Sequence, residues 1–317
     1  MWETVCMSKI YDVIILGAGP AGLAAGLYAG RARLSTLVLE KGQYGGQIAT
    51  TSEIENYPGQ QVESESGSSL AARMAVQMQR FGAERVSDTI RCVELTGNVK
   101  KLTGTRGTYL AKTVILATGA FPRPIGCKNE SRFVGRGISF CATCDGSLFE
   151  DLEVYVVGGG DSAVEEAIYL TKFARKVTII HRRNELRAAR SIQEKAFSNP
   201  KLAFLWETVI DEVFGDELLE RMVVRNVKTG EVTTVEADPE DGTFGLFGFI
   251  GFQPNSKLFE SVVNTENGYV VTDAYMRTNI PGVFAAGDIR VKPLRQVVTA
   301  VSDGAVAATQ AEKYLTG

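Results

Sequence analysis

The chain has 317 residues, 44% apolar and 22% charged, which is long enough for two domains of about 150 residues with separate cores. Its 34 basic and 37 acidic residues give a net charge of -3, so no excess of positive charge favours binding of a nucleic acid. The uncharged stretch 13–30 is interrupted by five Gly and Pro20, and the first twelve residues show no signal peptide. We expect a cytoplasmic protein that binds neither nucleic acid nor membrane.

A strand, a glycine turn, a helix and a second strand are predicted over residues 11–40, with the strands at 11–16 and 36–40 and the helix at 23–32. In this pattern Gly17 makes the turn, Gly19 lets backbone approach a pyrophosphate, and Gly22 lets the helix pack on the strand. Glu40 follows where an acid accepts hydrogen bonds from ribose hydroxyls. The simpler alternative is a glycine turn with a surface glutamate.

The same pattern recurs about 141 residues later, with strands at 152–157 and 176–180 and a helix at 164–173. Gly158, Gly160 and Ala163 occupy the three glycine positions, with Asp161 and Ser162 between them.

The end of the second strand in this later unit is basic. His181, Arg182 and Arg183 follow it directly, Arg187 comes shortly after, and no acid is present. A ribose that carries a 2′-phosphate needs cations where a bare ribose needs a carboxylate, so NADPH is expected in preference to NADH. The alternative is a solvated basic face.

The remaining elements predict a discontinuous first domain. We expect a loop at 63–69, a helix at 70–81 ended by Gly82, and a strand at 113–118. A hairpin at 221–235 turned at Thr229 and Gly230, a strand at 282–288 and a helix from about 296 to 315 follow. The fold class is α/β with two Rossmann-like domains: residues 1–120 and 249–317 form one, and 121–248 are inserted, with crossings near 120–124 and 246–251. The site whose second strand ends in an acid is expected to bind FAD, and the site whose second strand ends in basic residues is expected to bind NADPH. Hydride would then pass from the nicotinamide to the flavin.

Cys141 and Cys144 form the sole CxxC motif. A zinc site lacks ligands, because the one histidine, His181, is assigned to the phosphate site. A structural thiol pair is possible, but a CxxC beside nucleotide units favours thiol–disulfide exchange. Asp145 could supply the proton transfers that exchange requires, or it could simply be a turn residue before Gly146. The pair precedes Gly158 by 14 residues and therefore belongs to the inserted domain, together with the NADPH site. One flavin must then exchange electrons with both the nicotinamide and the disulfide, so we expect the inserted domain to move about the crossings.

Seven motifs resemble the low-molecular-weight, bacterial-type thioredoxin reductases over residues 8–315. They are GAGPAG, GGQ with ENYPG, ILATGA, CATCDG, GGGDSAVEEA, HRR with Arg187, and GVFAAGD followed by Arg295 and Gln296. The resemblance implies a homodimer that binds FAD, takes hydride from NADPH and reduces its own disulfide, which then reduces oxidised thioredoxin. It also implies rotation of the NADPH domain.

The resemblance also implies residue roles. Cys144 corresponds to the cysteine that faces the flavin, Cys141 to the one that attacks the partner disulfide, and Asp145 to the acid–base group. The implied FAD residues are Gly17, Gly19, Pro20, Ala21, Gly22, Glu40, Lys41, Gly46, Gln47, Asn56, Gly287, Asp288, Arg295, Gln296 and Val297. The implied NADPH residues are Gly158, Gly160, Asp161, Ser162, Ala163, His181, Arg182, Arg183 and Arg187. No metal is implied.

Two rival functions remain at this stage. A related flavoprotein could use another redoxin, a small disulfide or ferredoxin, and a flavin-binding module could hold CATC as a structural pair. The second would be yellow but would not bleach with NADPH. Residues 1–6 precede the usual beginning at Met7, and Cys6, Cys92 and Cys127 are expected to be spectator thiols.

Overall fold

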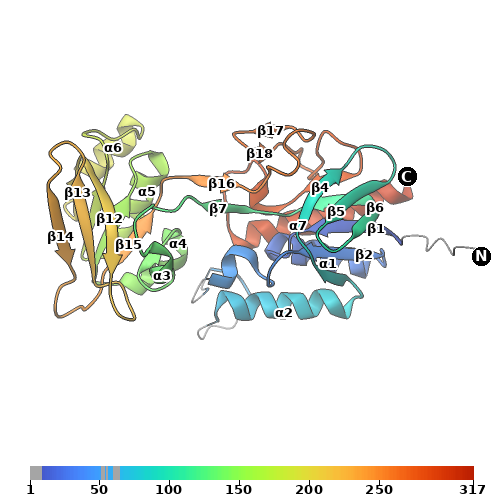
Figure 1. Cartoon of the computed structure of the whole chain (residues 1–317), viewed down its shortest axis with the longest axis horizontal. Helices are drawn as coiled ribbons and strands as arrows, with labels where there is room; N and C mark the ends of the chain where they lie inside the picture. Colours follow the sequence, from blue (N-terminus) through green and yellow to red (C-terminus); the bar gives the residue numbers. More distant parts are fainter. Residues whose placement is uncertain (1–8, 51–53, 55, 60–64) are drawn as a thin grey trace, which may run out of the picture. The chain divides into compact units, whose positions relative to one another are not determined.

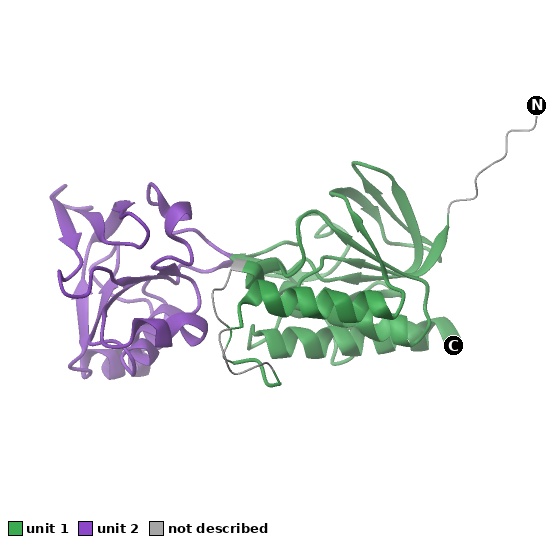
Figure 2. Ribbon diagram, turned by 90° about the horizontal axis from the view of Figure 1, so that it is seen from below, with its two compact units in different colours: residues 1–121, 253–317 green, residues 122–252 purple. Residues whose placement is uncertain are grey.

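A computed structural model describes residues 9–50, 54, 56–59 and 65–317. The chain divides into two compact units, shown in different colours in Figure 2. Unit 1 comprises residues 1–121 and 253–317, and unit 2 comprises residues 122–252. One unit is therefore built from two separate stretches of chain, and the α/β fold class with two Rossmann-like arrangements is confirmed.

Unit 1 is organised around a seven-stranded sheet (Figure 1). Its strands are β1 (Ile10–Leu16), β2 (Thr36–Glu40), β3 (Glu84–Ser87), β4 (Ile90–Glu94), β5 (Lys100–Gly104), β6 (Thr108–Leu116) and β19 (Val283–Ala285). The order is β3-β2-β1-β6-β5-β4, and β19 also pairs with β6. The pairs among β3, β2, β1, β6 and β19 are parallel, whereas β4, β5 and β6 form an antiparallel meander. Strand β6 therefore joins the meander to the parallel sheet.

The central parallel strands β1, β2, β6 and β19 carry runs of residues that are buried on both faces, as expected for parallel strands. Val13 and Ile15 face a core that contains residues of α1 (Pro20–Arg31), α2 (Gly67–Arg80) and α7 (Val297–Thr316). Ile14 and Leu16 face the opposite core, which is closed by the meander and by residues 258–289. The alternation of side chains along β1 thus produces two cores.

Unit 2 contains a five-stranded parallel sheet in the order β11-β10-β9-β15-β8. Its strands are β8 (Ile138–Ser139), β9 (Glu153–Val157), β10 (Lys176–Ile180), β11 (Leu202–Leu205) and β15 (Gly245–Gly248). One face packs against α5 (Asp161–Leu170) and α6 (Arg190–Phe197). The other faces the antiparallel sheet of β12 (Thr208–Phe214), β13 (Arg221–Asn226) and β14 (Val232–Glu236).

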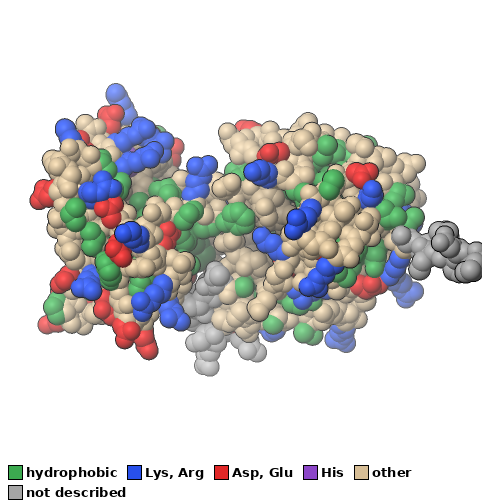
Figure 3. Space-filling model, viewed as in Figure 1, with side chains coloured by type: hydrophobic (Ala, Val, Ile, Leu, Met, Phe, Trp, Pro, Cys, Tyr) green, Lys and Arg blue, Asp and Glu red, His purple; other side chains and the backbone are tan. Residues whose placement is uncertain are grey.

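Short elements complete both units. In unit 2 they are α3 (Glu130–Phe133), α4 (Ala142–Asp145) and η2 (Gly146–Phe149); in unit 1 they are η1 (Gly46–Thr50), β17 (Thr265–Glu266), β18 (Tyr269–Val270) and η3 (Gly287–Ile289). The two crossing segments contain β7 (Ala120–Pro122) and β16 (Phe252–Pro254), which pair with each other. Acidic and basic side chains are interspersed on the face of each unit seen in Figure 3. Among the helices described, none is long and apolar enough to cross a membrane.

Most predicted elements are present, with shifted helix ends. Helix α1 begins at Pro20 because proline fits the first helical position, and α5 ends at Leu170, three residues before the predicted end. Part of the expected loop at 63–69 is instead helical, since α2 begins at Gly67 after Ser66, whose side chain accepts from the Ser69 amide at 3.2 Å. Residues 60–64 and Cys6 lie outside the described residues. The 221–235 hairpin is confirmed, with Gly230 at φ +75.

Helices α1 and α7 approach closely at Gly304, where an added Cβ would overlap the Ala21 carbonyl oxygen. We expect Gly304→Ala to lower the free energy of unfolding by about 2 kcal/mol, because backbone on α1 must move. The corresponding fall in Tm is about 5 °C by circular dichroism. Ser302→Ala, at an exposed position of the same helix, is the control. Equal melting of the two variants would contradict this account of the contact.

Candidate active site

The first glycine turn joins β1 to α1, and each glycine has a distinct environment. Gly17 has φ +110, and a Cβ there would overlap the Ala117 carbonyl oxygen. A Cβ on Gly22 would overlap the Gly17 carbonyl oxygen, whereas a Cβ on Gly19 would have Gly45 O, 3.9 Å away, as its nearest neighbour. The open position is also the N-cap of α1 and has no side-chain cap, so helix amides remain available for an anion.

Glu40 lies at the end of β2, as predicted. Its Oε2 accepts from the Ala18 amide at 2.8 Å, and its Oε1 accepts from the Gly42 amide at 2.9 Å. The carboxylate therefore stabilises the turn itself, and each oxygen retains a lone pair for another donor. The adjacent Lys41 is exposed.

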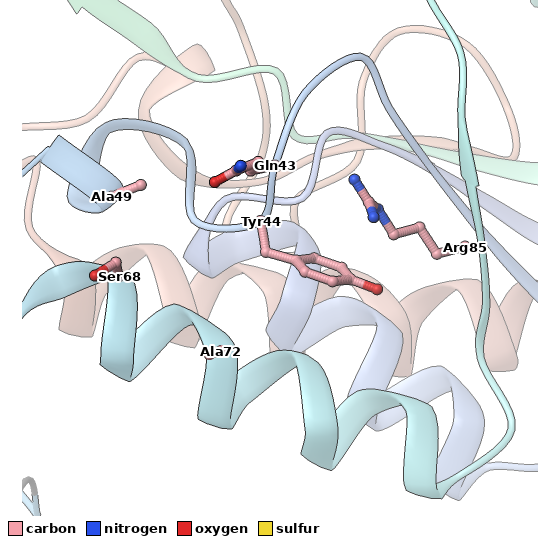
Figure 4. A pocket seen from close by; sticks show the side chains of 6 residues that line it. All are labelled: Gln43, Tyr44, Ala49, Ser68, Ala72 and Arg85. Carbon is pink, nitrogen blue, oxygen red and sulfur yellow. The ribbon is translucent and has the colours of Figure 1, made fainter.

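The loop after β2 is anchored by an aromatic residue that sequence reasoning missed. Tyr44 Oη accepts from Gln79 Nε2 at 2.8 Å, and the Arg85 guanidinium lies 4.2 Å from the tyrosine ring centre while donating to the Gly42 carbonyl. These side chains border a pocket of about 240 Å³ lined by Gln43, Tyr44, Ala49, Ser68, Ala72 and Arg85 (Figure 4). The contacts hold the loop that leads to Gly46, which has φ +56, and to Gln47 in η1.

Two predicted flavin residues that are 240 positions apart come together in unit 1. Asn56 Nδ2 donates to Gln296 Oε1 at 3.2 Å. Gln296 is also the N-cap of α7, where it forms a capping box with Thr299, and Val297 is the first residue of the helix. The ENYPG segment and the start of the last helix therefore share one site.

The turn after β19 carries Asp288, whose Oδ1 is buried and has no hydrogen-bond partner among the described residues. Burial raises the pKa of this carboxyl, and the cations Lys292 and Arg295 oppose the rise. Arg295 likewise has a buried Nε without a partner in the described parts, and its guanidinium lies 4.3 Å from the Tyr269 ring centre. An orphaned acceptor and an orphaned donor fit a polar ligand such as a flavin nucleotide.

Asp303 on α7 supports this turn, although sequence reasoning missed it. Its Oδ2 accepts from the Gly287 amide at 3.0 Å and from Lys292 Nζ at 2.8 Å, and its Oδ1 accepts from Arg290 at 2.9 Å. All three groups converge on a carboxylate that is 7% exposed. The only sequence signal was an acid inside an Ala/Val-rich helix, which does not reveal its partners.

The second glycine turn, between β9 and α5, repeats the arrangement of the first. Gly158 has φ +155, and a Cβ on it would lie 2.5 Å from the Ala163 Cβ, so the two small residues permit the close packing. A Cβ on Gly160 would meet no described atom within 4 Å, and Gly160 is an N-cap without a side-chain cap. Asp161 Oδ1 accepts from the Ala189 amide at 2.7 Å, and Ser162 is exposed. The turn therefore leaves room for a pyrophosphate at the start of α5.

His181 and the three predicted arginines follow β10. His181 is 5% exposed, and its Nε2 lacks a partner among the described residues. Burial lowers the pKa of this imidazole, and the charges of Arg187, Arg183 and Arg182 lower it further, so the ring is neutral at pH 7. The three guanidinium groups are exposed, and none is paired with a carboxylate in the described ranges. They are available for an external phosphate.

The cysteine pair lies between β8 and η2 in unit 2. Cys141 and Cys144 form a disulfide, with Cα atoms 5.3 Å apart. Asp145 follows within α4, and its Oδ2 accepts from Ser139 Oγ at 2.6 Å. Its Oδ1 is buried without a partner among the residues described. Burial raises the pKa of this carboxyl, and the hydrogen bond from Ser139 opposes the rise.

The candidate residues thus fall into two sets. Unit 1 contains the first glycine turn, Glu40, the pair of Asn56 and Gln296, and the Asp288 turn. Unit 2 contains the second glycine turn, the basic cluster and the disulfide. Two dinucleotide-type turns with a CxxC disulfide define a disulfide oxidoreductase that uses nucleotide cofactors.

Comparison with known proteins agrees with this class. The family model for pyridine nucleotide-disulphide oxidoreductase matches residues 11–304. A thioredoxin reductase of Peptoclostridium litorale is 59% identical over 310 residues, covering 98% of each chain, and that of Bacillus subtilis is 46% identical over 312 residues, covering 97% of this chain and 95% of the other. The crystal structure of thioredoxin reductase from Streptococcus pyogenes has a TM-score of 0.90 at 44% identity, covering 97% of this chain and 98% of that one. The chain belongs to the pyridine nucleotide-disulphide oxidoreductase family and, within it, to the thioredoxin reductases. The resemblance inferred from the seven motifs is confirmed.

Proposed function

We propose that this chain uses NADPH and FAD to reduce the disulfide of oxidised thioredoxin through its own Cys141–Cys144 pair. NADPH, one proton and oxidised thioredoxin become NADP⁺ and reduced thioredoxin. The observation that carries the proposal is the Cys141–Cys144 disulfide followed by the half-buried Asp145, in a chain with two dinucleotide-type turns.

We assign FAD to the domain formed by residues 1–120 and 249–317. When bound, FAD would accept a hydride from the nicotinamide and donate the electron pair to a disulfide. The open backbone at Gly19 would receive the pyrophosphate, with Pro20, Ala21 and Gly22 beginning the helix, and Glu40 with Lys41 would bind the ribose end. The remaining proposed flavin contacts are Gly46, Gln47, Asn56, Gly287, Asp288, Arg295, Gln296 and Val297.

We assign NADPH to the domain formed by residues 121–248. Gly158, Gly160, Asp161, Ser162 and Ala163 would surround the pyrophosphate at the start of α5. The exposed Arg182, Arg183 and Arg187 would bind the 2′-phosphate, with the neutral His181 beside them.

The thiol chemistry is assigned to three residues of unit 2. Cys144 would exchange electrons with the flavin, and Cys141 would attack the thioredoxin disulfide. Asp145 would carry the proton, since burial favours its protonated form while its Oδ1 has no partner in the described structure. Because the two cofactor domains are separate units, we also propose that unit 2 moves about the crossings during turnover.

A homodimer in the cytoplasm is proposed from the motif resemblance. Another redoxin, a small disulfide or ferredoxin as partner remains the alternative, but the thioredoxin reductases of several organisms match nearly the full length of this chain, which favours thioredoxin.

The decisive experiment is NADPH consumption by the purified yellow protein with and without oxidised thioredoxin. We expect rapid bleaching of the flavin by NADPH and sustained consumption only when thioredoxin is present. Bleaching of the flavin without sustained NADPH consumption would indicate that the substrate is a disulfide other than that of thioredoxin. A flavin that NADPH does not bleach would contradict the cofactor assignment.

A further inference from the structure

We propose that Ser139 is a positioning residue for the thiol–disulfide exchange, whose hydroxyl orients the Asp145 carboxyl and links its protonation to the backbone of Cys141. The inference rests on the proposed function, because it takes Asp145 as the proton carrier. Ser139 precedes the CxxC motif and was not among the candidate residues found from the sequence.

The geometry places one hydroxyl between the acid and the cysteine. Ser139 is the last residue of β8 and is 5% exposed. Its Oγ lies 2.6 Å from Asp145 Oδ2 and accepts a hydrogen bond from the Cys141 amide at 3.1 Å. The Cys141 carbonyl oxygen lies 3.4 Å from the same Oγ. The hydroxyl therefore contacts the carboxyl and both backbone groups of Cys141.

This arrangement accommodates both protonation states of Asp145. A serine hydroxyl has one proton and two lone pairs. When Asp145 is ionised, the hydroxyl donates a charge-assisted hydrogen bond to Oδ2; when Oδ1 takes up a proton, the hydroxyl still donates to Oδ2, in a weaker hydrogen bond. Ser139 thus keeps a partner in each state, while Oδ1 remains for proton exchange with a thiol.

The charged surroundings make Ser139 the group that tunes this acid. Helix α5 packs against α4 and carries Asp161, Glu165 and Glu166, whereas η2 and β8 carry no titratable side chain. Burial raises the pKa of Asp145 and the Ser139 hydrogen bond lowers it, so the serine alone offsets desolvation of the carboxylate among the described groups.

The chemical step needs a proton carrier at this position. The Cys141 thiolate attacks thioredoxin, a Cys141–thioredoxin disulfide forms, the thioredoxin disulfide breaks, and the departing thiolate takes a proton. The Cys144 thiolate then attacks the Cys141 sulfur, the Cys141–Cys144 disulfide forms, and the second thioredoxin thiolate leaves and takes a proton. Two electrons and the two protons of the cysteine pair pass to thioredoxin. Asp145 shuttles the protons, and Ser139 keeps its carboxyl oriented.

The test compares the wild-type holoenzyme with Ser139→Ala. The alanine variant lacks the hydroxyl that donates to the charged carboxylate, so the pKa of Asp145 rises. The limb of the pH–rate profile that reports titration of Asp145 therefore moves to higher pH by about one unit. At the optimum we expect thioredoxin reduction to slow about tenfold, while flavin reduction by NADPH in the stopped flow is unchanged. Ser139→Thr keeps the hydroxyl and should keep the wild-type profile. If the alanine protein does not fold, Ser139→Gly removes the same hydroxyl and carries the same expectation.

A double-mutant cycle separates action through Asp145 from a merely structural role. Ser139→Ala should slow the wild type but not the Asp145→Asn enzyme. An unshifted pH profile, or an equal further loss in the Asp145→Asn background, would overturn the proposal. So would a normal rate in Asp145→Asn itself, even with an active wild type. Failure of the wild-type holoenzyme to reduce thioredoxin would instead contradict the proposed function.

Discussion

Cys144→Ser is expected to lower NADPH-dependent thioredoxin reduction by more than about a thousandfold while leaving reduction of the flavin by NADPH intact. Serine cannot form the disulfide with Cys141, so electrons on the flavin have no acceptor within the chain. Cys144 is not among the contacts proposed for NADPH or for the FAD-binding residues, so hydride transfer from NADPH to the flavin is preserved. Stopped-flow absorbance of the flavin, paired with steady-state NADPH consumption, measures both effects.

Cys92→Ser is the matched control for this change. Cys92 is a free, exposed cysteine on β4 in unit 1, and replacing it removes a thiol of the same size. It should leave both rates within about twofold of the wild type. Substantial thioredoxin reduction by Cys144→Ser would show that electrons reach thioredoxin by another path.

The double variant Arg182→Ala and Arg183→Ala is expected to lower kcat/KM for NADPH by about 100-fold and to change kcat/KM for NADH by less than about threefold. Each charge-assisted contact with a phosphate contributes about 1.5–3 kcal/mol, and NADH has no 2′-phosphate to lose. Both guanidinium groups are exposed and unpaired with acids in the described residues, so removing them leaves no buried charge behind. Initial rates of flavin reduction with the two nucleotides measure the preference.

Arg221→Ala provides the comparison for a general loss of positive charge. Arg221 is an exposed arginine of the same unit, on β13, with its guanidinium 5.1 Å from the Phe214 ring centre. It should leave the NADPH/NADH preference unchanged. If the NADPH/NADH preference were unaltered in the double variant, or changed equally in Arg221→Ala, Arg182 and Arg183 would be part of a solvated basic face and not of a phosphate site.

Much of the candidate site could be predicted from sequence because its signals are local. The glycine turns, the acid at the end of β2 and the arginines after β10 lie at short, characteristic distances along the chain, where backbone geometry requires particular residue types. The cysteine pair is equally local, since the two cysteines are only three positions apart along the chain. Helix ends were less accurate, because caps such as Ser66 depend on single hydrogen bonds.

Contacts between distant segments could not be predicted in this way. Nothing in the composition of ENYPG or of the last helix shows that Asn56 will meet Gln296, or that Asp303 will hold the Gly287 turn together with Lys292. The Asn56–Gln296 contact exists because β19 pairs with β6 and brings the last stretch of chain back to the first. The Asp303 contacts join the turn after β19 to α7, 11 and 16 positions apart along the chain. The extra strand β12 beside the predicted hairpin is also a product of long-range pairing.

By itself the sequence determined the two nucleotide turns, the redox pair and the fold class, because each depends on residue type at fixed local spacing. The tertiary structure was needed to show which polar atoms are buried without partners among the described residues, including those of Asp288, Asp145 and His181, and which hydroxyl contacts the Asp145 carboxyl. Burial is set by elements that are remote along the chain, and the Ser139–Asp145 hydrogen bond by the path of the chain from β8 to α4. Together they control the pKa values on which the chemistry depends.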